Sequence, residues 1–389
     1  MLLLLIAGVD PGRLPKVVET GFGNVASAHG AVNATIPTSP FRDTDRMHGG
    51  RDARVSAEAG RRQVTLRDVA QLAGVSVATA SKAINGKAEV HPDTRERVLE
   101  VARRLSFTPN ALARAILDGH TGTVGLLTHD LVGRFSLPIL MGAEDAFAGR
   151  TSVLLCDSRG DAIREQHHLN TLLARRVDGL IVVGSQTDPR PSLGHEVPVP
   201  VVYVYAPSED PTDASVVPDN VTAGRLAAEH LIATGRRRIA HISGDVSYAA
   251  ATDRATGVDA ALAEHGLHTV GEVRYGSWSE AWGRTATPAL LEHDQVDAIV
   301  CGSDQIARGV LDALRDRGLR VPEDVAVIGF DNWEPMTSGA RPGLTSVDMN
   351  FQQMGRRAAE RLALAVRGEI APGVEPITPR VVVRGSTVG

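Results

Sequence analysis

The most informative segment of the chain is V-T-L-R-D-V-A-Q-L-A-G-V-S-V-A-T-A-S-K-A-I-N-G, residues 64–86. Its first half carries apolar residues at the spacing of one helix face, namely Leu66, Val69, Ala70 and Ala73. Thr65 precedes this run and Asp68 follows Thr65 by three residues, which is typical of a capping box at a helix start. Gly74 then ends the helix, because glycine accepts the positive φ of a tight turn without strain.

A second short helix follows this glycine. Ser76 is placed to cap it, and Asn85 and Gly86 end it. Its buried face consists of Ala80, Ala83 and Ile84. Two short helices joined by a glycine-containing turn predict a helix-turn-helix, whose second helix can enter the major groove of DNA. An ordinary pair of packed helices without DNA binding is the alternative interpretation.

The next segments extend the pattern. Pro92 stands at a helix start, and residues 94–105 predict a third helix. Its apolar face is formed by Val98, Leu99, Ala102 and Leu105. In order and spacing, the blocks V-T-L-R-D-V-A-Q-L-A-G-V-S, T-R-E-R-V and F-T-P-N-A-L-A-R resemble the LacI/GalR family, the lactose-repressor family of bacterial transcription regulators. The resemblance covers roughly residues 63–389.

Charge is distributed unevenly along the chain. The formal net charge is −5, so the protein as a whole is not a basic nucleic-acid coat. Residues 61–114, however, hold ten basic and five acidic residues. The basic ones are Arg61, Arg62, Arg67, Lys82, Lys87, Arg95, Arg97, Arg103, Arg104 and Arg114, and the acidic ones are Asp68, Glu89, Asp93, Glu96 and Glu100. This local excess of positive charge favours DNA binding by the N-terminal domain.

Length and cysteine content limit the class of protein. A chain of 389 residues exceeds one compact core and predicts two or three domains. Cys156 and Cys301 stand in apolar runs without metal-ligand spacing, so we expect reduced core thiols. No apolar run approaches the ~20 residues of a membrane span. These features predict a cytoplasmic, nucleoid-associated protein with no membrane partner, no metal site and no cofactor.

The first 62 residues form a separate segment. Residues 9–60 are rich in Gly, Pro, Ser, Thr and Ala and show no sustained period, so we expect disorder there. The apolar start, Met1 to Ile6, is followed by residues too polar for a signal peptide. Because members of the resembled family usually begin just before the helix-turn-helix, we expect translation to start downstream, at Met47.

From residue 123 onward, apolar β-branched runs alternate with helical segments. The predicted strands are residues 123–127, 152–156, 178–183, 199–204, 238–243, 272–275, 297–301 and 325–329. The predicted helices are residues 137–148, 162–175, 223–233, 253–265, 280–292, 305–317 and 354–366. Such alternation indicates parallel sheets covered on both faces. The predicted fold class is α/β, with a helix-turn-helix headpiece and two similar lobes that bind a ligand between them.

The resemblance implies domain boundaries. It gives a helix-turn-helix domain over residues 63–109, a hinge helix and linker over 110–120, and an effector-binding and dimerisation core over 121–389. This core is periplasmic-binding-protein-like, and its chain crosses three times between the lobes. The first lobe then comprises about 121–217 and 347–374, and the second about 218–346 and 375–389.

The resemblance also implies which residues contact DNA. The positions of Val77, Ala78 and Lys82 match those that contact base edges in the major groove. Val and Ala can touch a thymine methyl, and Lys82 can donate to guanine with less fixed geometry than Arg. Plain filling of the helix surface is the alternative role of Val77 and Ala78. Short polar side chains suited to phosphates are Thr65, Ser76, Thr79, Ser81 and Asn85.

Residues 110–117 match the hinge helix of the resembled family, with Asn110 and Ala113 among its predicted DNA contacts. A helix this short is marginal alone, so we expect it to form when two copies meet on DNA. Relatives insert a leucine into the central minor-groove step. Ile116 stands at that position here, and its branched side chain can still act as a wedge.

Side chains after the second-lobe strands predict an effector site. Arg254, in D-R-A-T-G, can bind hydroxyls or a carboxylate, although a surface arginine paired with Asp253 is the alternative. The resemblance implies that Asp331 accepts hydrogen bonds from sugar hydroxyls and that Trp278 stacks on a sugar ring. Ser303 is expected to face the same cleft. The adjoining acidic residue, Asp304, either faces the cleft or caps the next helix.

The first lobe departs from the family pattern. Relatives often carry N-P-F-F where this chain has G-R-F-S, residues 133–136. Only Phe135 is kept, and we assign it to the effector site. Arg134 in this segment indicates an unusual or charged effector. Asp219 and Asn220 mark the first crossing between the lobes, and a purely structural role is an alternative for them.

Other classes of function find little support in the sequence. No Ser-His-Asp order, convincing carboxylate pair, phosphate-binding glycine loop or HExxH motif is present, so an enzyme is not expected. The helix-turn-helix opposes a binding protein without DNA activity. The sequence predicts a DNA-binding transcriptional regulator, a repressor, whose affinity for a double-stranded operator is controlled by a small molecule, a carbohydrate. We expect a homodimer, because no heptad repeat for a tetramer follows the core.

Overall fold

A computed structural model describes residues 64–389, apart from 88, 108–118, 132–133, 294 and 370. The predicted N-terminal extension, Met47 and the hinge contacts lie outside the described residues. In the part that the structure describes, no helix is long and apolar enough to cross a membrane.

Three helices form the headpiece, as predicted: α1 (Leu66–Ala73), α2 (Val77–Ile84) and α3 (Pro92–Arg104). The capping box of α1 is confirmed, because the Thr65 N–H donates to Asp68 Oδ2 at 2.8 Å and the Asp68 N–H donates to Thr65 Oγ1 at 3.4 Å. Gly74 ends α1 with a φ of 65°, the left-handed conformation expected for this turn. Ser76 Oγ accepts from the Thr79 N–H at 3.0 Å and caps α2.

Small apolar residues hold the three helices together. The buried cluster consists of Val69, Ala70, Ala73, Ala80, Ala83, Val90, Val98, Val101 and Ala102. The Arg97 Nε–H also donates to the carbonyl of Ala73 at 3.1 Å, which satisfies a terminal carbonyl of α1 from α3. One face of α2 is therefore committed to the core, and its opposite face is left to solvent.

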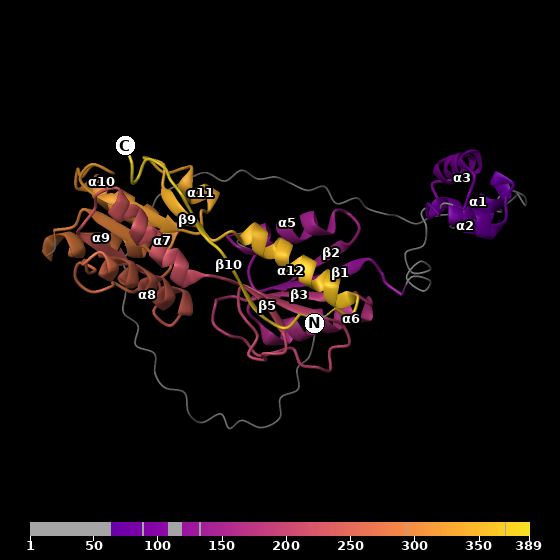
Figure 1. Cartoon of the computed structure of the whole chain (residues 1–389), viewed down its shortest axis with the longest axis horizontal. Coiled ribbons are helices and arrows are strands. Elements are labelled where there is room, and N and C mark those ends of the chain that lie inside the picture. The colour runs from indigo at the N-terminus through magenta and orange to yellow at the C-terminus, as the bar shows by residue number, and fades with distance from the viewer. Residues whose placement is uncertain (1–63, 88, 108–118, 132–133, 294, 370) are drawn as a thin grey trace, which may run out of the picture. The chain divides into compact units, whose positions relative to one another are not determined.

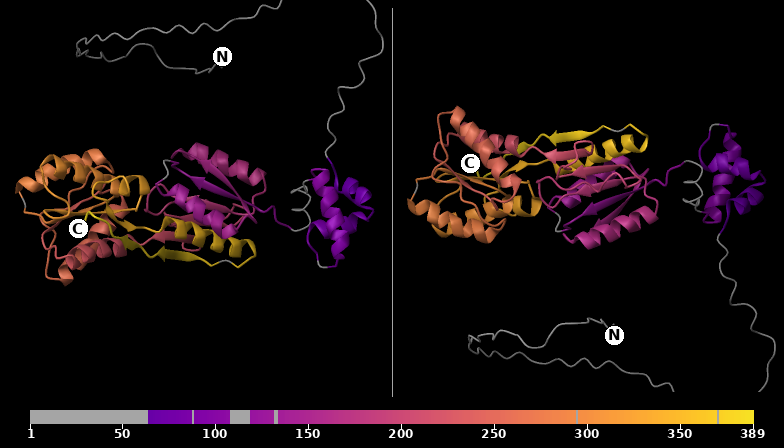
Figure 2. Two further views of the ribbon diagram at one scale, coloured as in Figure 1. Left: turned by 90° about the horizontal axis from the view of Figure 1, so that it is seen from above. Right: turned by 90° about the horizontal axis from the view of Figure 1, so that it is seen from below.

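A six-stranded sheet, parallel between all neighbours, forms the first lobe (Figure 1). Its order is β10-β5-β4-β3-β1-β2. The strands are β1 (Thr123–Thr128), β2 (Ser152–Asp157), β3 (Leu180–Val183), β4 (Val201–Val204), β5 (Ala214–Pro218) and β10 (Gly373–Ile377). Helices cover both faces (Figure 2): α5 (Ser136–Phe147) and α12 (Phe351–Val366) pack on one, and α6 (Ala162–Ala174) packs on the other.

A five-stranded sheet of order β11-β9-β8-β7-β6 forms the second lobe. Its pairs are parallel except for β11 with β9, which is antiparallel. The strands are β6 (Ile239–Ile242), β7 (Ala298–Cys301), β8 (Ala326–Phe330), β9 (Thr345–Asp348) and β11 (Arg380–Val382). The helices are α7 (Asn220–Ala233) and α8 (Ala249–Glu264) on one face, α9 (Glu280–His293) and α10 (Asp304–Asp316) on the other, and the short α11 (Glu334–Thr337).

Each sheet is faced by helices that approach one another closely at glycines. A Cβ on Gly142 of α5 would lie 1.8 Å from the Gln352 carbonyl oxygen of α12, and a Cβ on Gly355 of α12 would lie 1.9 Å from the Ile139 oxygen of α5. The pairs α7–α8 and α9–α10 repeat this arrangement through Gly224 with Gly257 and Gly283 with Gly309. Only glycine permits backbones to pack at this distance.

The structure corrects several sequence predictions. Residues 272–275 do not form a strand, because Arg274 makes only a single bridge to Ile242. The short strands β5, β9, β10 and β11 were not predicted, since they contain Pro or polar residues. Sheet membership puts the crossings after Pro218, Asp348 and Ile377, whereas the expected boundaries were at about 217, 346 and 374. Strand pairing extends β9 and β10 beyond those limits.

Candidate functional site

The exposed face of α2 carries the residues predicted to contact bases. Val77 is 43% exposed, and Ala78 and Lys82 are also exposed. The buried residues of the same helix, Ala80 and Ala83, face the headpiece core. The headpiece leaves a large part of this apolar residue uncovered, so this face of α2 is available to a partner.

Ion pairing holds Lys82 in place. Its ammonium group donates to the carboxylate of Glu89, and both side chains are more than half exposed. The hydrogen bond and charge of Lys82 lower the pKa of Glu89, so this carboxylate stays ionised at neutral pH. Exposed ion pairs contribute little to folding stability, so Lys82 can exchange this partner for a DNA acceptor at small cost.

The predicted phosphate-binding side chains differ in their free donors. The Thr65 hydroxyl donates to Asp68 Oδ2 at 2.7 Å, so its proton is already used within the capping box. The hydroxyls of Ser76 and Thr79 lie 2.8 Å apart, which leaves one of the two protons free. Asn85 donates to the half-buried Ser81 at 3.4 Å. Asn110, Ala113 and Ile116 lie outside the described residues.

A pocket of about 20 Å³ lies between the two lobes. The first lobe contributes Arg134, Ser185, Gln186, Thr187 and Tyr205, and the second contributes Tyr248, Ala250, Arg254, Trp278 and Asp331. Three residues assigned to the effector site from the sequence, Arg254, Trp278 and Asp331, therefore meet at one place. Tyr205 and Tyr248 were missed, because their roles depend on how the lobes face each other and no local sequence signal marks them.

Arg254 is a buried residue with fixed partners. Its side chain is 2% exposed, which excludes the alternative of a surface arginine paired with Asp253. Nε donates to Asn220 Oδ1 at 2.9 Å, Nη1 donates at 2.5 Å to the Gly302 carbonyl, and Nη2 lies 3.4 Å from Asp331 Oδ1. The guanidinium also lies 4.7 Å from the centre of the Phe330 ring. Asn220 thus orients the arginine from the first residue of α7.

Asp331 is held in a strained conformation at the carboxyl end of β8. Its backbone φ is 94°, a value that residues other than glycine rarely adopt. Such backbone strain is concentrated at functional sites. Arg134 Nη1 reaches its carboxylate from the other lobe at 3.6 Å. Burial lowers the pKa of Arg134, but the charges of Asp331 and neighbouring acidic groups outweigh burial and raise the pKa overall.

Phe135 and Ser303 do not line the pocket in this structure. The Phe135 ring is buried and stacks on Tyr205, with 4.3 Å between the ring centroids. It therefore packs behind a residue that lines the pocket. Ser303 accepts from the Ile306 N–H at 3.3 Å and is the N-cap of α10. The carboxylate of Asp304 caps no helix; it accepts from the Trp333 N–H and the Ser346 hydroxyl, both at 2.7 Å. Burial, assisted by the charge of Asp331, raises its pKa well above the usual value.

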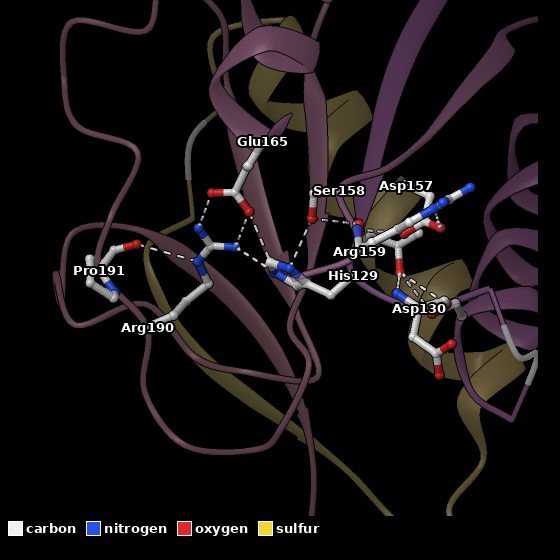
Figure 3. A network of polar contacts seen from close by, with 10 residues as sticks. His129, Asp130, Asp157, Ser158, Arg159, Glu165, Arg190 and Pro191 are labelled. Atoms are coloured by element: carbon white, nitrogen blue, oxygen red, sulfur yellow. Dashed lines mark hydrogen bonds and ion pairs between the residues drawn. The ribbon is translucent and has the colours of Figure 1, made fainter. Parts of the chain in front are cut away.

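A second pocket, of about 290 Å³, adjoins the first through the shared residues Ser185 and Gln186. Figure 3 shows its polar wall, in which Arg190 and Glu165 form a two-pronged ion pair at 2.7 and 3.3 Å. His129 lies between Glu165, at 3.4 Å, and the Ser158 hydroxyl, at 3.0 Å (Figure 3). Burial lowers the pKa of His129 against the opposing charge of Glu165. This wall is therefore internally neutralised.

Comparisons with known proteins match this arrangement. The model for bacterial regulatory proteins of the lacI family matches residues 65–110, and the model for the periplasmic binding protein-like domain matches residues 228–387. Catabolite control protein A of Priestia megaterium is 34% identical over 83% of this chain and 99% of its own length. The HTH-type transcriptional regulator CelR of Thermobifida fusca is 34% identical over 79% of this chain and 94% of its own length.

Solved structures give the same result. A lac repressor dimer bound to operator and the anti-inducer ONPF is 27% identical, with a TM-score of 0.69 over 84% of this chain and 100% of that one. A complex of the regulator CelR with cellobiose is 31% identical, with a TM-score of 0.59 over 83% of this chain and 99% of that one. The similarity thus spans the headpiece and both lobes together.

Proposed function

Because the chain belongs to the LacI family of bacterial regulatory proteins, we propose that it is a homodimeric repressor whose operator affinity is controlled by a carbohydrate. Members of this family are DNA-binding transcriptional regulators and not enzymes. The observation that carries the proposal is the pocket lined from both lobes by Arg134, Arg254 and Asp331. A ligand held by residues of both lobes fixes the position of one lobe relative to the other. Through this change an effector can act on the distant DNA-binding domain.

Operator recognition is assigned to the exposed face of α2. Lys82 donates to a guanine in the major groove, and Val77 and Ala78 contact thymine methyl groups. Such contacts discriminate less sharply than bidentate arginine pairs, each of which is worth ~1–3 kcal/mol. Specificity therefore also depends on the deformation of the DNA at the hinge, where Ile116 acts as the wedge.

The effector site is assigned to the interlobe pocket. Trp278 and Tyr248 line this pocket with ring centres 6.0 Å apart in an edge arrangement, and they supply aromatic surface for a sugar. Asp331 provides acceptors for hydroxyls, and the structural relative with cellobiose supports a carbohydrate as the ligand. A coupling of ~1–3 kcal/mol between the two sites changes operator affinity roughly 5–150-fold.

The test uses the full-length chain. Duplexes selected from a random pool are ranked against non-specific competitor in gel shifts at several salt concentrations, with and without a panel of sugars. We expect one family of related duplexes to be enriched and its affinity to change with a sugar. Lys82→Ala should relax the preference at one base pair in each half-site. Selection of no sequence over competitor, under any of these conditions, contradicts the proposal.

A further inference from the structure

Arg134 is a pocket residue with unused hydrogen-bonding capacity. Its guanidinium is 22% exposed, and its polar contact within the described residues is the 3.6 Å approach to Asp331, which is too long for a hydrogen bond. The guanidinium carbon of Arg134 lies 5.6 Å from the centre of the Phe135 ring, which has no oxygen that could accept a hydrogen bond. Arg254, by contrast, is anchored by Asn220 and by the Gly302 carbonyl. The guanidinium of Arg134 has five N–H donors, and among the described residues it has no hydrogen-bonded acceptor.

Charges in the pocket lining are unbalanced. Two guanidinium groups, Arg134 and Arg254, share the single lining carboxylate, Asp331, at 3.6 and 3.4 Å. Both distances exceed the ~2.7–2.9 Å of a good charge-assisted hydrogen bond. Asp304 is close by, but its two oxygens are taken by Trp333 and Ser346. Within the lining, two guanidinium charges therefore face one carboxylate, and the other aspartates that act on Arg134, Asp130 and Asp304, lie outside it.

We propose that the effector carries an anionic group, a carboxylate or a phosphate, which Arg134 binds in this pocket. The inference rests on the proposed function, since it specifies which carbohydrates the interlobe site takes: sugar acids or sugar phosphates. Two acceptor oxygens of such a group match the planar fork of a guanidinium, and closure of the lobes then buries a compensated charge. A neutral sugar leaves Arg134 with only its long contact to Asp331, a carboxylate that Arg254 shares.

The cavities on either side of Arg134 are consistent with this role. The pocket of about 20 Å³ has room for little more than a water molecule. A cavity of about 370 Å³ adjoins it, and Arg134 and Asp331 line both. Their ion pair therefore borders both spaces. An anion that takes Arg134 away from Asp331 joins the spaces and frees the carboxylate for sugar hydroxyls.

Calorimetry on the full-length chain tests the proposal with matched ligands. Glucose is compared with gluconate, glucuronate and glucose 6-phosphate, galactose with galactonate, galacturonate and galactose 6-phosphate, and inorganic phosphate serves as the minimal anion. We expect an anionic member to bind about ten-fold or more tightly than its neutral counterpart and to weaken with added salt. Arg134→Gln should lose about ten-fold in affinity for the anion, and Arg134→Lys less than that.

The matched control is Arg159→Gln, which removes the same charge from an exposed side chain of the same lobe and should leave every affinity unchanged. Thermal unfolding of each variant confirms that it is folded. Equal or tighter binding of the neutral sugars, an unchanged anion affinity in Arg134→Gln, or no response to any anion up to millimolar concentration overturns the proposal. Operator binding by the same preparations is scored separately, and its absence contradicts the proposed function instead.

Discussion

His241 is a basic side chain buried on β6 with no partner. It is 1% exposed, and neither ring nitrogen has a hydrogen bond to any described residue. Burial, and then the positive charge of Arg254, lower its pKa to about 4. The unfolded chain, in which histidine has its usual pKa near 6.5, therefore binds a proton more readily than the folded chain between these two values.

This difference predicts a loss of stability in mild acid. The contribution of His241 is complete above pH 6.5 and is lost as the pH falls towards 4, to a total of about 3 kcal/mol. His241→Leu replaces the unpaired polar group by an apolar one of similar size and should stabilise the fold by ~1–3 kcal/mol. Urea unfolding at pH 7 and pH 5 measures both effects. A variant that keeps the full pH dependence of the wild type shows that other groups cause it.

The ion pair between Lys82 and Glu89 gives a prediction about DNA affinity. Glu89→Gln removes a carboxylate that competes with DNA for the ammonium group, so operator affinity should rise several-fold at low salt. Unfolding stability should stay unchanged, because the pair is exposed. Gel shifts over a salt series measure the effect, with Glu100→Gln on α3 as the matched loss of one negative charge. An equal gain in both variants indicates a general charge effect and not release of Lys82.

For single residues, the sequence predicted which residues belong to the pocket better than it predicted what each side chain contacts. Arg254 was singled out by its charge and its place after a strand, and Trp278 and Asp331 by the family resemblance. The pocket brings the three together, and effector binding by them stays a prediction. Phe135 and Ser303 were assigned to the same site, but the structure turns one into a packing residue and the other into a helix cap. Which way a side chain faces depends on partners far away in the sequence, and one local motif cannot specify it.

Among the elements, the paired helices depend on glycines at their crossings. Gly355→Ala should destabilise the first lobe by ~1–3 kcal/mol, although alanine is the better helix former by ~1 kcal/mol, because the new methyl group would meet the Ile139 carbonyl 1.9 Å away. Thermal and urea unfolding measure the change. Ala365→Gly, on the same helix and only half-buried, is the control and should lose only the helix-propensity difference. Unchanged or increased stability of Gly355→Ala would mean that the two helices can separate freely.

The ends of helices and strands were predictable where neighbouring residues in the sequence determine them. The capping box of α1, the glycine after it and the apolar strands β1, β3, β7 and β8 all follow from short-range pattern. Helix α8 was predicted to begin at residue 253, yet it begins at Ala249. The N–H of Ala249 donates to Asp188, which lies in the other lobe, and a local sequence pattern cannot predict such a cap.

For the whole molecule, this cap is one of the links between the lobes. Both oxygens of Asp188 accept from the Ala249 N–H, at 3.2 and 3.1 Å. A carboxylate at a helix N-terminus is stabilised by the helix dipole as well as by the hydrogen bond. A motion of the lobes that separates Arg134 from Asp331 would also strain this contact. Asp188 thus stabilises the arrangement of the two lobes in this structure.

Asp188→Ala should therefore expose the first turn of α8 and leave the rest of that helix protected. A hydrogen bond to a charged group contributes ~1.5–3 kcal/mol, so amide exchange at residues 249–252 should accelerate about ten-fold or more. Hydrogen-exchange mass spectrometry measures this, and the first turn of α7 is the internal control, because Asp219 caps it from its own lobe at 2.9 Å. Asp188→Asn keeps an acceptor and should show a smaller effect. Equal acceleration in both helices would indicate general destabilisation, and no acceleration would mean that the first turn of α8 is protected without Asp188.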